Sequence, residues 1–366
     1  MKLRLTFLAL LLTCFQTAFA QKPTPTPKID DDIIKVSSRL VVVPVSVTDP
    51  SGNPVEGLTA QDFRISEEGK PQTIENVGSA DKMPLEIALL FDVSASTDKM
   101  FKFQQETAAR FLKQILKPED RATIYTIGQK PVLIQGRDVA ERSIASVMSI
   151  MPTKGATAFF DTVSAAAKQL QATAPLGTRK VIVVISDGED NFSEGLRMKQ
   201  RMEESNIAAG KPDPDYKEVK KVIVTAQEKT KLAERAKVLH GLHNADTVFY
   251  SINPAGSSYL LNQISVFGQE NMKEFADATG GSAYLPKFLA VDTKDAYQNE
   301  NNMKKNQATL ELIFRQLASE LRAQYLVQYY SESEFPTDKY VKLEVSVPTH
   351  GGPRVRARQG YYVKNN

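Results

Sequence analysis

Five oxygen-bearing side chains lie in three loops of this 366-residue chain, beside predicted strands and helices. The apolar run LEIALLF ends on Asp92 and is followed by Ser94 and Ser96. Thr157 lies in KGATAFFDTV, just before a predicted helix, and Asp187 follows the apolar run VIVVIS and precedes a glycine. Because ligands of open α/β sheets bind at the carboxyl ends of the strands, we expect these three loops to converge.

The chemistry of this set favours a hard divalent cation. All five side chains offer oxygen and none offers nitrogen or sulfur, which suits Mg²⁺, with Mn²⁺ or Ca²⁺ as alternatives, and argues against zinc or copper. Mg²⁺ keeps several waters and so needs few protein ligands. Neutral hydroxyls leave the cation short of negative charge, so a carboxylate from a partner protein would complete its coordination.

The elements around these loops read as an α/β sheet. LEIALLF, RATIYTI, KVIVVIS and DTVFYSI are continuous apolar runs, typical of parallel strands buried on both faces. Helical patterns cover about 98–116, 159–172 and 306–323. Short alternating segments with turn residues precede and follow this unit, and predict antiparallel strands. We therefore expect one β-sandwich built from both ends of the chain, with the α/β unit inserted in it.

The three motifs D-x-S-x-S, GATA and SDG resemble the metal-ion-dependent adhesion site of von Willebrand factor A (VWFA) domains over about 84–290. VTDPSGNPVEGLTAQDF and VRARQGYYV are similar to segments of a bacterial exported subfamily. The resemblance implies a doubly wound, mostly parallel, Rossmann-like sheet and metal-dependent protein binding without catalysis. It also implies that Ser94 and Ser96 contact the metal directly and Asp92 directly or through water. Thr157 and Asp187 would exchange direct and water-mediated roles when a ligand binds.

The predicted organisation has six parts. The expected order along the chain is a signal peptide at 1–20, a Pro/Thr-rich linker at 21–38, the first part of the sandwich at 39–80, a VWFA domain at 84–305, a helical insertion within it at about 195–243, and a linking helix with the last sandwich strands at 306–366. The insertion follows Asp187, is unusually long for the family, and is expected to form one or two helices near the metal face.

The amino-terminal residues predict export. A basic start, an apolar run and Ala18-Phe19-Ala20 form a secretory signal, and the run is too short to span a bilayer comfortably. A lipoprotein signal at Cys14 is disfavoured because Leu12 and Thr13 precede it. Cys14 is the only cysteine, so the mature chain would have no disulfide. The expected location is the periplasm, the cell surface or the medium.

Charge and motifs exclude several function classes. Without the signal the chain has nearly equal numbers of acidic and basic residues, which gives no reason to expect nucleic acid or a membrane surface as partner. No catalytic or phosphate-binding signature is present, and no general base accompanies the loops, so a metal-water hydrolase is disfavoured. A structural or assembly protein, in which the metal only stabilises the fold, remains the alternative to a binding module.

Simpler structural roles compete at each candidate position. Asp92 and the serines could cap a helix, and Asp187 could belong to an ordinary turn. The remaining groups are expected to be structural: Glu189 and Asp190 in a solvated loop, His240 and His243 at the surface, the lysines of 211–237 on a solvated helix face, and Tyr329, Tyr330, Tyr361 and Tyr362 in sandwich strands.

Overall fold

The computed structural model describes residues 39–94, 101–153, 155–209, 216–254, 263–291, 293–348 and 352–364. The predicted signal peptide, the linker and Ser96 lie outside these ranges. Within them, no helix combines the length and the hydropathy needed to cross a membrane.

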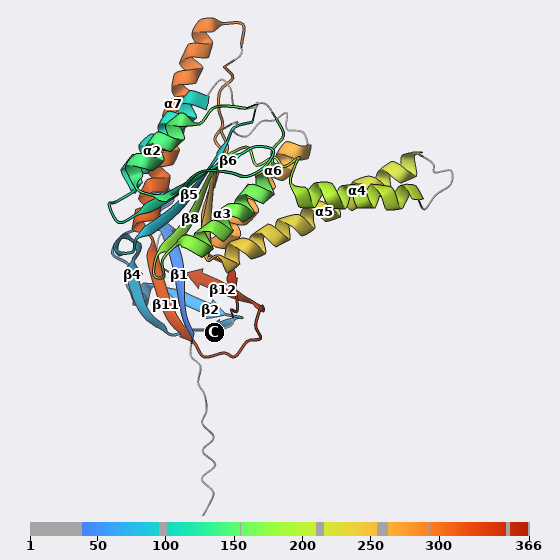
Figure 1. The fold of residues 1–366 in the computed structure, drawn as a ribbon. Coiled ribbons are helices and arrows are strands. Elements are labelled where there is room, and N and C mark those ends of the chain that lie inside the picture. The colour runs from blue at the N-terminus through green and yellow to red at the C-terminus, as the bar shows by residue number, and fades with distance from the viewer. Residues whose placement is uncertain are drawn as a thin grey trace, which may run out of the picture. The chain divides into compact units, whose positions relative to one another are not determined.

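A six-stranded sheet forms the α/β part of the chain (Figure 1). Its strands lie in the order β10 (Ala283–Tyr284), β9 (Thr247–Ile252), β8 (Arg179–Ile185), β5 (Leu85–Asp92), β6 (Arg121–Ile127) and β7 (Val132–Asp138). All neighbours are parallel except β7, which pairs antiparallel with β6 at one edge. Numbered along the chain from β5, with β7 as the third strand, the order is 3-2-1-4-5-6, the doubly wound arrangement. The predicted fold class is confirmed.

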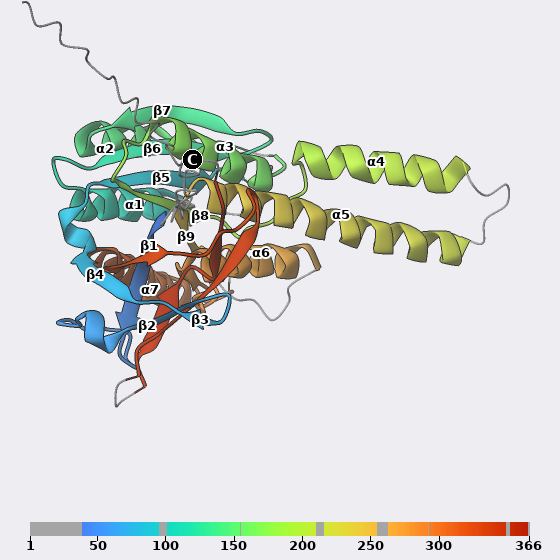
Figure 2. The same ribbon diagram turned by 90° about the horizontal axis from the view of Figure 1, so that it is seen from below.

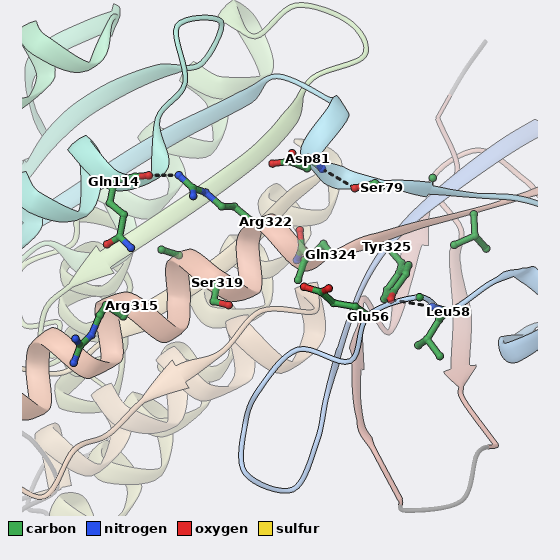
Figure 3. Close-up of a pocket in the computed structure, with 15 residues that line it drawn as sticks. Glu56, Leu58, Ser79, Asp81, Gln114, Arg315, Ser319, Arg322, Gln324 and Tyr325 are labelled. Carbon is green, nitrogen blue, oxygen red and sulfur yellow. Dashed lines mark hydrogen bonds between the residues drawn. The ribbon is translucent and has the colours of Figure 1, made fainter.

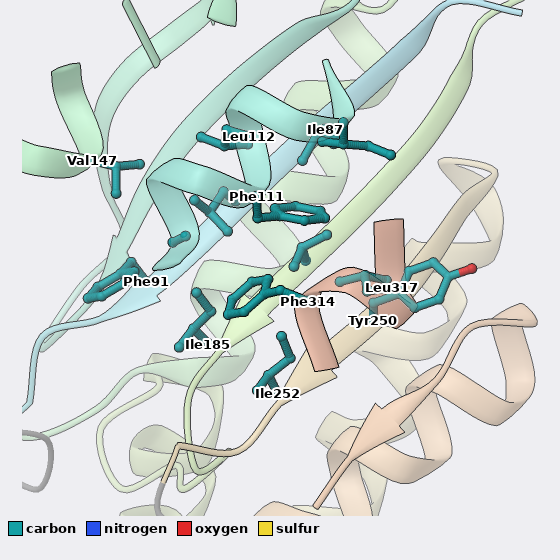
Figure 4. Close-up of a cluster of buried hydrophobic side chains, with 14 of the residues drawn as sticks. Ile87, Phe91, Phe111, Leu112, Val147, Ile185, Tyr250, Ile252, Phe314 and Leu317 are labelled. Atoms are coloured by element: carbon teal, nitrogen blue, oxygen red, sulfur yellow. The ribbon is translucent and has the colours of Figure 1, made fainter. Parts of the chain in front are cut away.

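Alternating residues of the strands face two separate layers of helices. Ile87, Leu89 and Phe91 pack with α1 (Phe101–Ile115), α2 (Ala140–Ser149) and α7 (Ala296–Ala323). Figure 4 shows Ile87 and Phe91 in this cluster with side chains of the three helices. Ala88 and Leu90 pack with α3 (Phe159–Thr173), α5 (Tyr216–Asn244) and α6 (Gln263–Thr279). Every residue of β5 is buried, because both faces of the strand are covered. This double coverage explains the continuous apolar runs of the sequence.

Two antiparallel sheets enclose a third core. One has the order β13 (Arg354–Ala357), β1 (Arg39–Thr48), β11 (Tyr325–Ser331) and β4 (Ile74–Ser79). The other has the order β14 (Gly360–Tyr362), β12 (Tyr340–Ser346), β2 (Arg64–Glu67) and β3 (Lys70–Pro71). Two short 3₁₀ turns lie between strands: η1 (Ala60–Asp62) lies between β1 and β2, and η2 (Ala80–Lys82) lies between β4 and β5. Side chains of both sheets share one apolar cluster, so strands from both ends of the chain build one sandwich.

Helix α7 joins the two parts. It begins at Ala296, ten residues before the predicted start, and only Gln324 separates it from β11. Beside its last turns lies a cavity of about 670 Å³ (Figure 3). There Arg322 donates a hydrogen bond to the backbone carbonyl of Gln114, and the hydroxyl of Tyr325 accepts one from the Leu58 N–H. The junction is therefore fixed by contacts from both sides.

The segment 195–243 contains two helices. Helix α4 (Glu194–Ala209) extends away from the sheet, and the first part of α5 returns beside it, so the two helices form a projecting hairpin (Figure 2). The last turns of α5 are different, because Val238 and Leu242 are buried in the core beside α3 and α6. Only the outer part of the segment is therefore separate from the main core.

Candidate metal centre

Asp92 ends the central strand β5, and its side chain is buried with 1% exposure. Its Oδ1 accepts a hydrogen bond of 2.9 Å from the Ser94 N–H, and its Oδ2 accepts one of 2.6 Å from the Ser186 hydroxyl. Burial raises the pKa of Asp92, and the charge of Glu189 raises it further, while the hydrogen bonds from Ser186 and Ser94 lower it. A cation at this position would offset the cost of burying the carboxylate.

Ser186 connects the first and third loops. β5 and β8 are parallel, with Phe91 opposite Ile185, so the next residues, Asp92 and Ser186, lie side by side. The Ser186 hydroxyl also accepts a hydrogen bond of 3.0 Å from the Gly188 N–H. The strand order reverses between β5 and β8, and this switch point is where doubly wound sheets bind their ligands.

The Thr157 loop is attached on both sides. The Thr153 N–H donates to the Val93 carbonyl at 2.7 Å, and the Ala158 N–H donates to the Gly128 carbonyl at 2.7 Å. On the other side, the Thr157 N–H donates to Oδ1 of Asn191 at 2.8 Å, and its carbonyl accepts from the Asn191 N–H at 3.0 Å. Thr157 is thereby buried between the ends of β5 and β6 and the loop after β8.

Asp187 begins the third loop and is half-buried. Its Oδ1 accepts a hydrogen bond of 3.0 Å from the Glu189 N–H, and Gly188 adopts a φ of +77°, which favours glycine. Glu189 in turn accepts a hydrogen bond from the Ser265 hydroxyl of α6. The loop is thus held between α6 and the Asp92 side chain.

Hydrogen bonds between the three loops bring Asp92, Ser94, Thr157 and Asp187 to one edge of the sheet in the described chain. Ser96, the fifth predicted ligand, lies outside the described residues. The described ranges hold no group of three or more His, Cys, Asp or Glu side chains able to bind a metal. The predicted set contains only two carboxylates, so the remaining donors would have to be hydroxyls and water. Oxygen donors around a buried acid fit Mg²⁺.

Sequence reasoning missed the residues that position this site. Ser186 binds Asp92 and Asn191 binds the Thr157 loop. Both lie in the ISDGEDN segment, of which the sequence analysis named Asp187, Glu189 and Asp190 but neither of these two residues. Their partners are distant in sequence, so no local pattern identifies them. The position of Ser186 at the end of an apolar strand, directly before Asp187, was the available signal.

The prediction that Asp190 lies in a solvated loop is wrong. Its side chain is buried, and it accepts hydrogen bonds from the Phe160 N–H at 2.7 Å and from the Ser193 hydroxyl at 2.6 Å. Phe160 lies in the first turn of α3, whose exposed N–H groups need acceptors. Burial raises the pKa of Asp190, and these hydrogen bonds lower it. Asp190 therefore caps α3 from another loop.

The prediction that His243 lies at the surface is also wrong. His243 is 7% exposed, and its ring centroid lies 5.5 Å from that of Tyr340 and 6.0 Å from that of Tyr362. His240 is partly exposed, and its Nε2 lies 3.1 Å from Asp338. Both histidines contact sandwich residues, which gives them a structural role in joining α5 to β12 and β14.

Comparison with known proteins gives likenesses of fold. No protein-family model and no curated protein sequence matches the chain. Similar solved structures include proximal thread matrix protein 1 from the mussel byssus (TM-score 0.42, 11% identity, 70% of this chain and 50% of that one) and the SpRpn10 VWA domain (TM-score 0.34, 13% identity, 56% and 87%). Another is BatB from Bacteroides thetaiotaomicron (TM-score 0.34, 12% identity, 62% and 99%).

A second structure of the byssus protein has a zinc-occupied MIDAS motif, which is a property of that protein. This chain spans about half the length of the byssus protein. At these identities and TM-scores, the likenesses carry no argument about activity or partners. The strand order, the two helix layers and the loop positions are observed in the chain itself. The doubly wound, mostly parallel sheet that the VWFA-like motifs imply is therefore observed between residues 85 and 284.

Proposed function

We propose that this chain is an exported, non-enzymatic protein-binding module that captures an acidic residue of a partner through a divalent cation. The observation that supports it best is the convergence of four predicted ligands at the switch point of a doubly wound sheet. The hydroxyls of Ser94, Ser96 and Thr157 and the carboxylates of Asp92 and Asp187 would hold the metal. Mg²⁺ suits this donor set, with Mn²⁺ or Ca²⁺ as alternatives.

The bound cation would supply a positive charge that attracts the partner's carboxylate. The chain's own residues do the positioning. Ser186 holds one oxygen of Asp92, and the Asn191 contacts keep Thr157 beside it. The nearby acids Glu189 and Asp190 are already hydrogen-bonded to Ser265 and to the start of α3. This arrangement supports binding rather than proton transfer.

Calorimetric titration of residues 21–366 with Mg²⁺, Mn²⁺ and Ca²⁺ tests the metal site. We expect Asp92→Asn and Thr157→Ala to weaken Mg²⁺ binding at least tenfold. Asp277→Asn is the matched control, because Asp277 is a half-exposed acid on α6 that pairs with Lys273. Unchanged Mg²⁺ affinity in both folded variants would contradict the proposal. Circular dichroism would establish that each variant is folded.

Capture of a partner is tested separately. The chain is used to retain proteins from the native cell envelope in Mg²⁺ or in EDTA, and with Thr157→Ala in place of the unmodified chain. Partners retained only in Mg²⁺, and lost with the folded variant, are expected. Retention that is the same in Mg²⁺ and EDTA would contradict the metal-dependent mechanism.

One observation favours the structural alternative. On the projecting helix α4, Met198 and Met202 are exposed, by 56% and 63%. Exposed apolar side chains on an extended hairpin suit a protein contact that needs no metal. In that case the metal would only stabilise the sheet edge. Folded Thr157→Ala would then retain the partner with full affinity.

A further inference from the structure

A second cavity, of about 450 Å³, lies at the amino-terminal ends of strands β8 and β9, whereas the metal centre lies at the carboxyl ends of the strands. Its wall includes Arg179 and Lys180 at the start of β8 and Thr247 at the start of β9, whereas Asp92 and Asp187 lie at or beyond the strand ends. Seven residues of β8 separate the two edges, a distance of about 20 Å. The cavity is therefore distinct from the metal centre. Its volume is in the range of small-molecule sites, roughly 300–1,000 Å³.

Positive charge dominates the polar part of this cavity. Four cationic side chains line it, from Arg179, Lys180, Arg358 and Lys364, against one carboxylate, Asp246. Arg358 pairs with Asp246 at 2.6 Å and also donates to the Val42 carbonyl. Arg179 donates to the Leu321 carbonyl at 2.8 Å. Two of the four cations therefore have fixed partners in the protein.

Lys180 and Lys364 make no side-chain hydrogen bond or ion pair with the described part of the chain. Burial lowers the pKa of Lys180, and the charges of Lys364 and Arg358 lower it further, while Asp246 raises it. For Asp246, burial alone would raise the pKa, but the charges of Arg358, Lys180 and Lys364 lower it overall. Its side chain is nonetheless 46% exposed, because the cavity is open to solvent. An anion in the cavity would be stabilised by these cations.

The wall also has an apolar part, beside uncharged polar side chains such as Gln171 and Gln324. Val42 and Pro44 of β1 and Leu326 of β11 contribute from the sandwich, and Val181 and Val248 contribute from the α/β sheet. A simple inorganic anion would leave these side chains without contacts. An amphipathic ligand would instead pack against them and place its charge near Lys180. Such walls with a few converging polar groups are typical of small-molecule sites.

We propose that this cavity binds a small organic anion, a carboxylate on an apolar chain. The carboxylate would lie near Lys180 and Lys364, and the chain would lie against Val42, Pro44 and Leu326. Because the wall is shared by β1 and β11 of the sandwich and β8 and β9 of the sheet, bound ligand would stabilise both parts together. This site does not depend on the metal centre.

Octanoate is the probe for this site. Calorimetric titration of residues 21–366 is expected to show one bound octanoate per chain. The midpoint temperature of thermal unfolding is expected to rise with octanoate concentration. Lys180→Gln should weaken binding at least fivefold. Lys168→Gln, an exposed lysine of α3 outside the cavity, should bind as the unmodified chain does. Urea unfolding of both variants establishes that their folds are intact.

Two further ligands define the chemical class. Neutral 1-octanol and inorganic phosphate should each bind at least tenfold more weakly than octanoate. If 1-octanol bound with the same affinity as octanoate, the charge of the ligand would play no part in binding. If phosphate bound with the same affinity as octanoate, the apolar wall would play no part. Either result, or Lys180→Gln that binds normally, would overturn the proposal. Asp92→Asn should leave octanoate affinity unchanged, which separates this test from that of the metal centre.

Discussion

Buried acids serve different purposes in this chain. Glu67 accepts hydrogen bonds from the hydroxyls of Tyr329, Ser331 and Tyr361, at 2.9, 2.8 and 2.6 Å, and so joins the two sheets of the sandwich. Asp190 caps α3. Asp92 instead lies at the edge of the sheet, where three loops meet. Burial is the first cause of its raised pKa, and the neighbouring charge of Glu189 acts in the same direction. Of these three acids, Asp92 is the one placed to gain from a cation.

At the same scale, His243 should make the stability of the chain depend on pH. Burial lowers its pKa from 6.5 to about 4, and the charges of Arg358 and His240 contribute. Between about pH 4 and pH 6.5, His243 is therefore protonated in the unfolded chain and neutral in the folded chain. The free energy of unfolding contributed by this group is complete above pH 6.5 and falls as the pH drops towards 4. By proton linkage, the loss between pH 7.5 and 5.0 is about 2 kcal/mol.

Urea unfolding of the unmodified chain and of His243→Phe measures this loss. Phe keeps an aromatic ring against Tyr340 and Tyr362 but has no proton to gain. The variant should lose about 2 kcal/mol less stability over this pH interval. Equal pH dependence in His243→Phe and the unmodified chain would contradict the assigned pKa.

At the scale of elements, the sequence predicted the parts whose signal is local. The four apolar runs became β5, β6, β8 and β9, because strands covered on both faces must be apolar throughout. The edge strand β7 was not predicted because its apolar residues are confined to Val132, Leu133 and Ile134, and none of its seven residues is buried, so it lacks the long apolar run of a covered strand. Helix α2 lies directly after it and was also missed.

For the candidate metal centre too, the sequence predicted the local features and not the long-range contacts. Its ligands were predicted because their residue types, and their places after strands or, for Thr157, before a helix, are visible in the sequence. The supporting contacts were not, since Asp190 reaches Phe160 and Ser186 reaches Asp92 across long sequence separations. The role of His243 depends on Tyr340 and Tyr362 of the sandwich, which the sequence does not place beside α5.

A close contact between two glycines fixes α6 against the Asp187 loop. A Cβ on Gly268 would lie 2.7 Å from the carbonyl carbon of Gly188, closer than real Cβ contacts allow. Gly268→Ala must therefore move α6 or the loop, and we expect it to lower the free energy of unfolding by about 1–3 kcal/mol. Because Asp187 lies in this loop, Mg²⁺ affinity should fall as well.

Gly241→Ala is the matched control for this change. Gly241 lies within α5, and a Cβ there would meet nothing within 4 Å. Replacing an open helical glycine by alanine should raise the free energy of unfolding by about 0.5–1 kcal/mol. Urea unfolding and calorimetric Mg²⁺ titration compare the two variants. Equal stability and equal Mg²⁺ affinity in Gly268→Ala and the unmodified chain would show that the contact does not constrain the loop.

At the scale of the whole molecule, the described chain from residue 39 onward is joined by several contacts between the α/β sheet and the sandwich. Helix α7 continues almost directly into β11, the end of α5 packs on β14, and Arg358 bonds to Asp246. The 450 Å³ cavity lies among these contacts. A ligand in it would therefore act on the junction of both parts, whereas a metal would act at the opposite edge of the sheet.

The hairpin of α4 and α5 lies outside this framework, so its role can be separated by deletion. Replacing 201–224 with a short Gly/Ser linker removes no member of the apolar clusters found in the described chain, whereas removing 195–243 would also remove Leu196, Val238 and Leu242. We expect the shorter deletion to change the free energy of unfolding by less than about 1 kcal/mol and to leave Mg²⁺ affinity unchanged. Urea unfolding and calorimetry measure these two quantities.

If the metal centre captures the partner, the chain without 201–224 should still retain envelope proteins in Mg²⁺ and release them in EDTA. Loss of these proteins from a folded chain with normal Mg²⁺ affinity would instead assign partner binding to the hairpin.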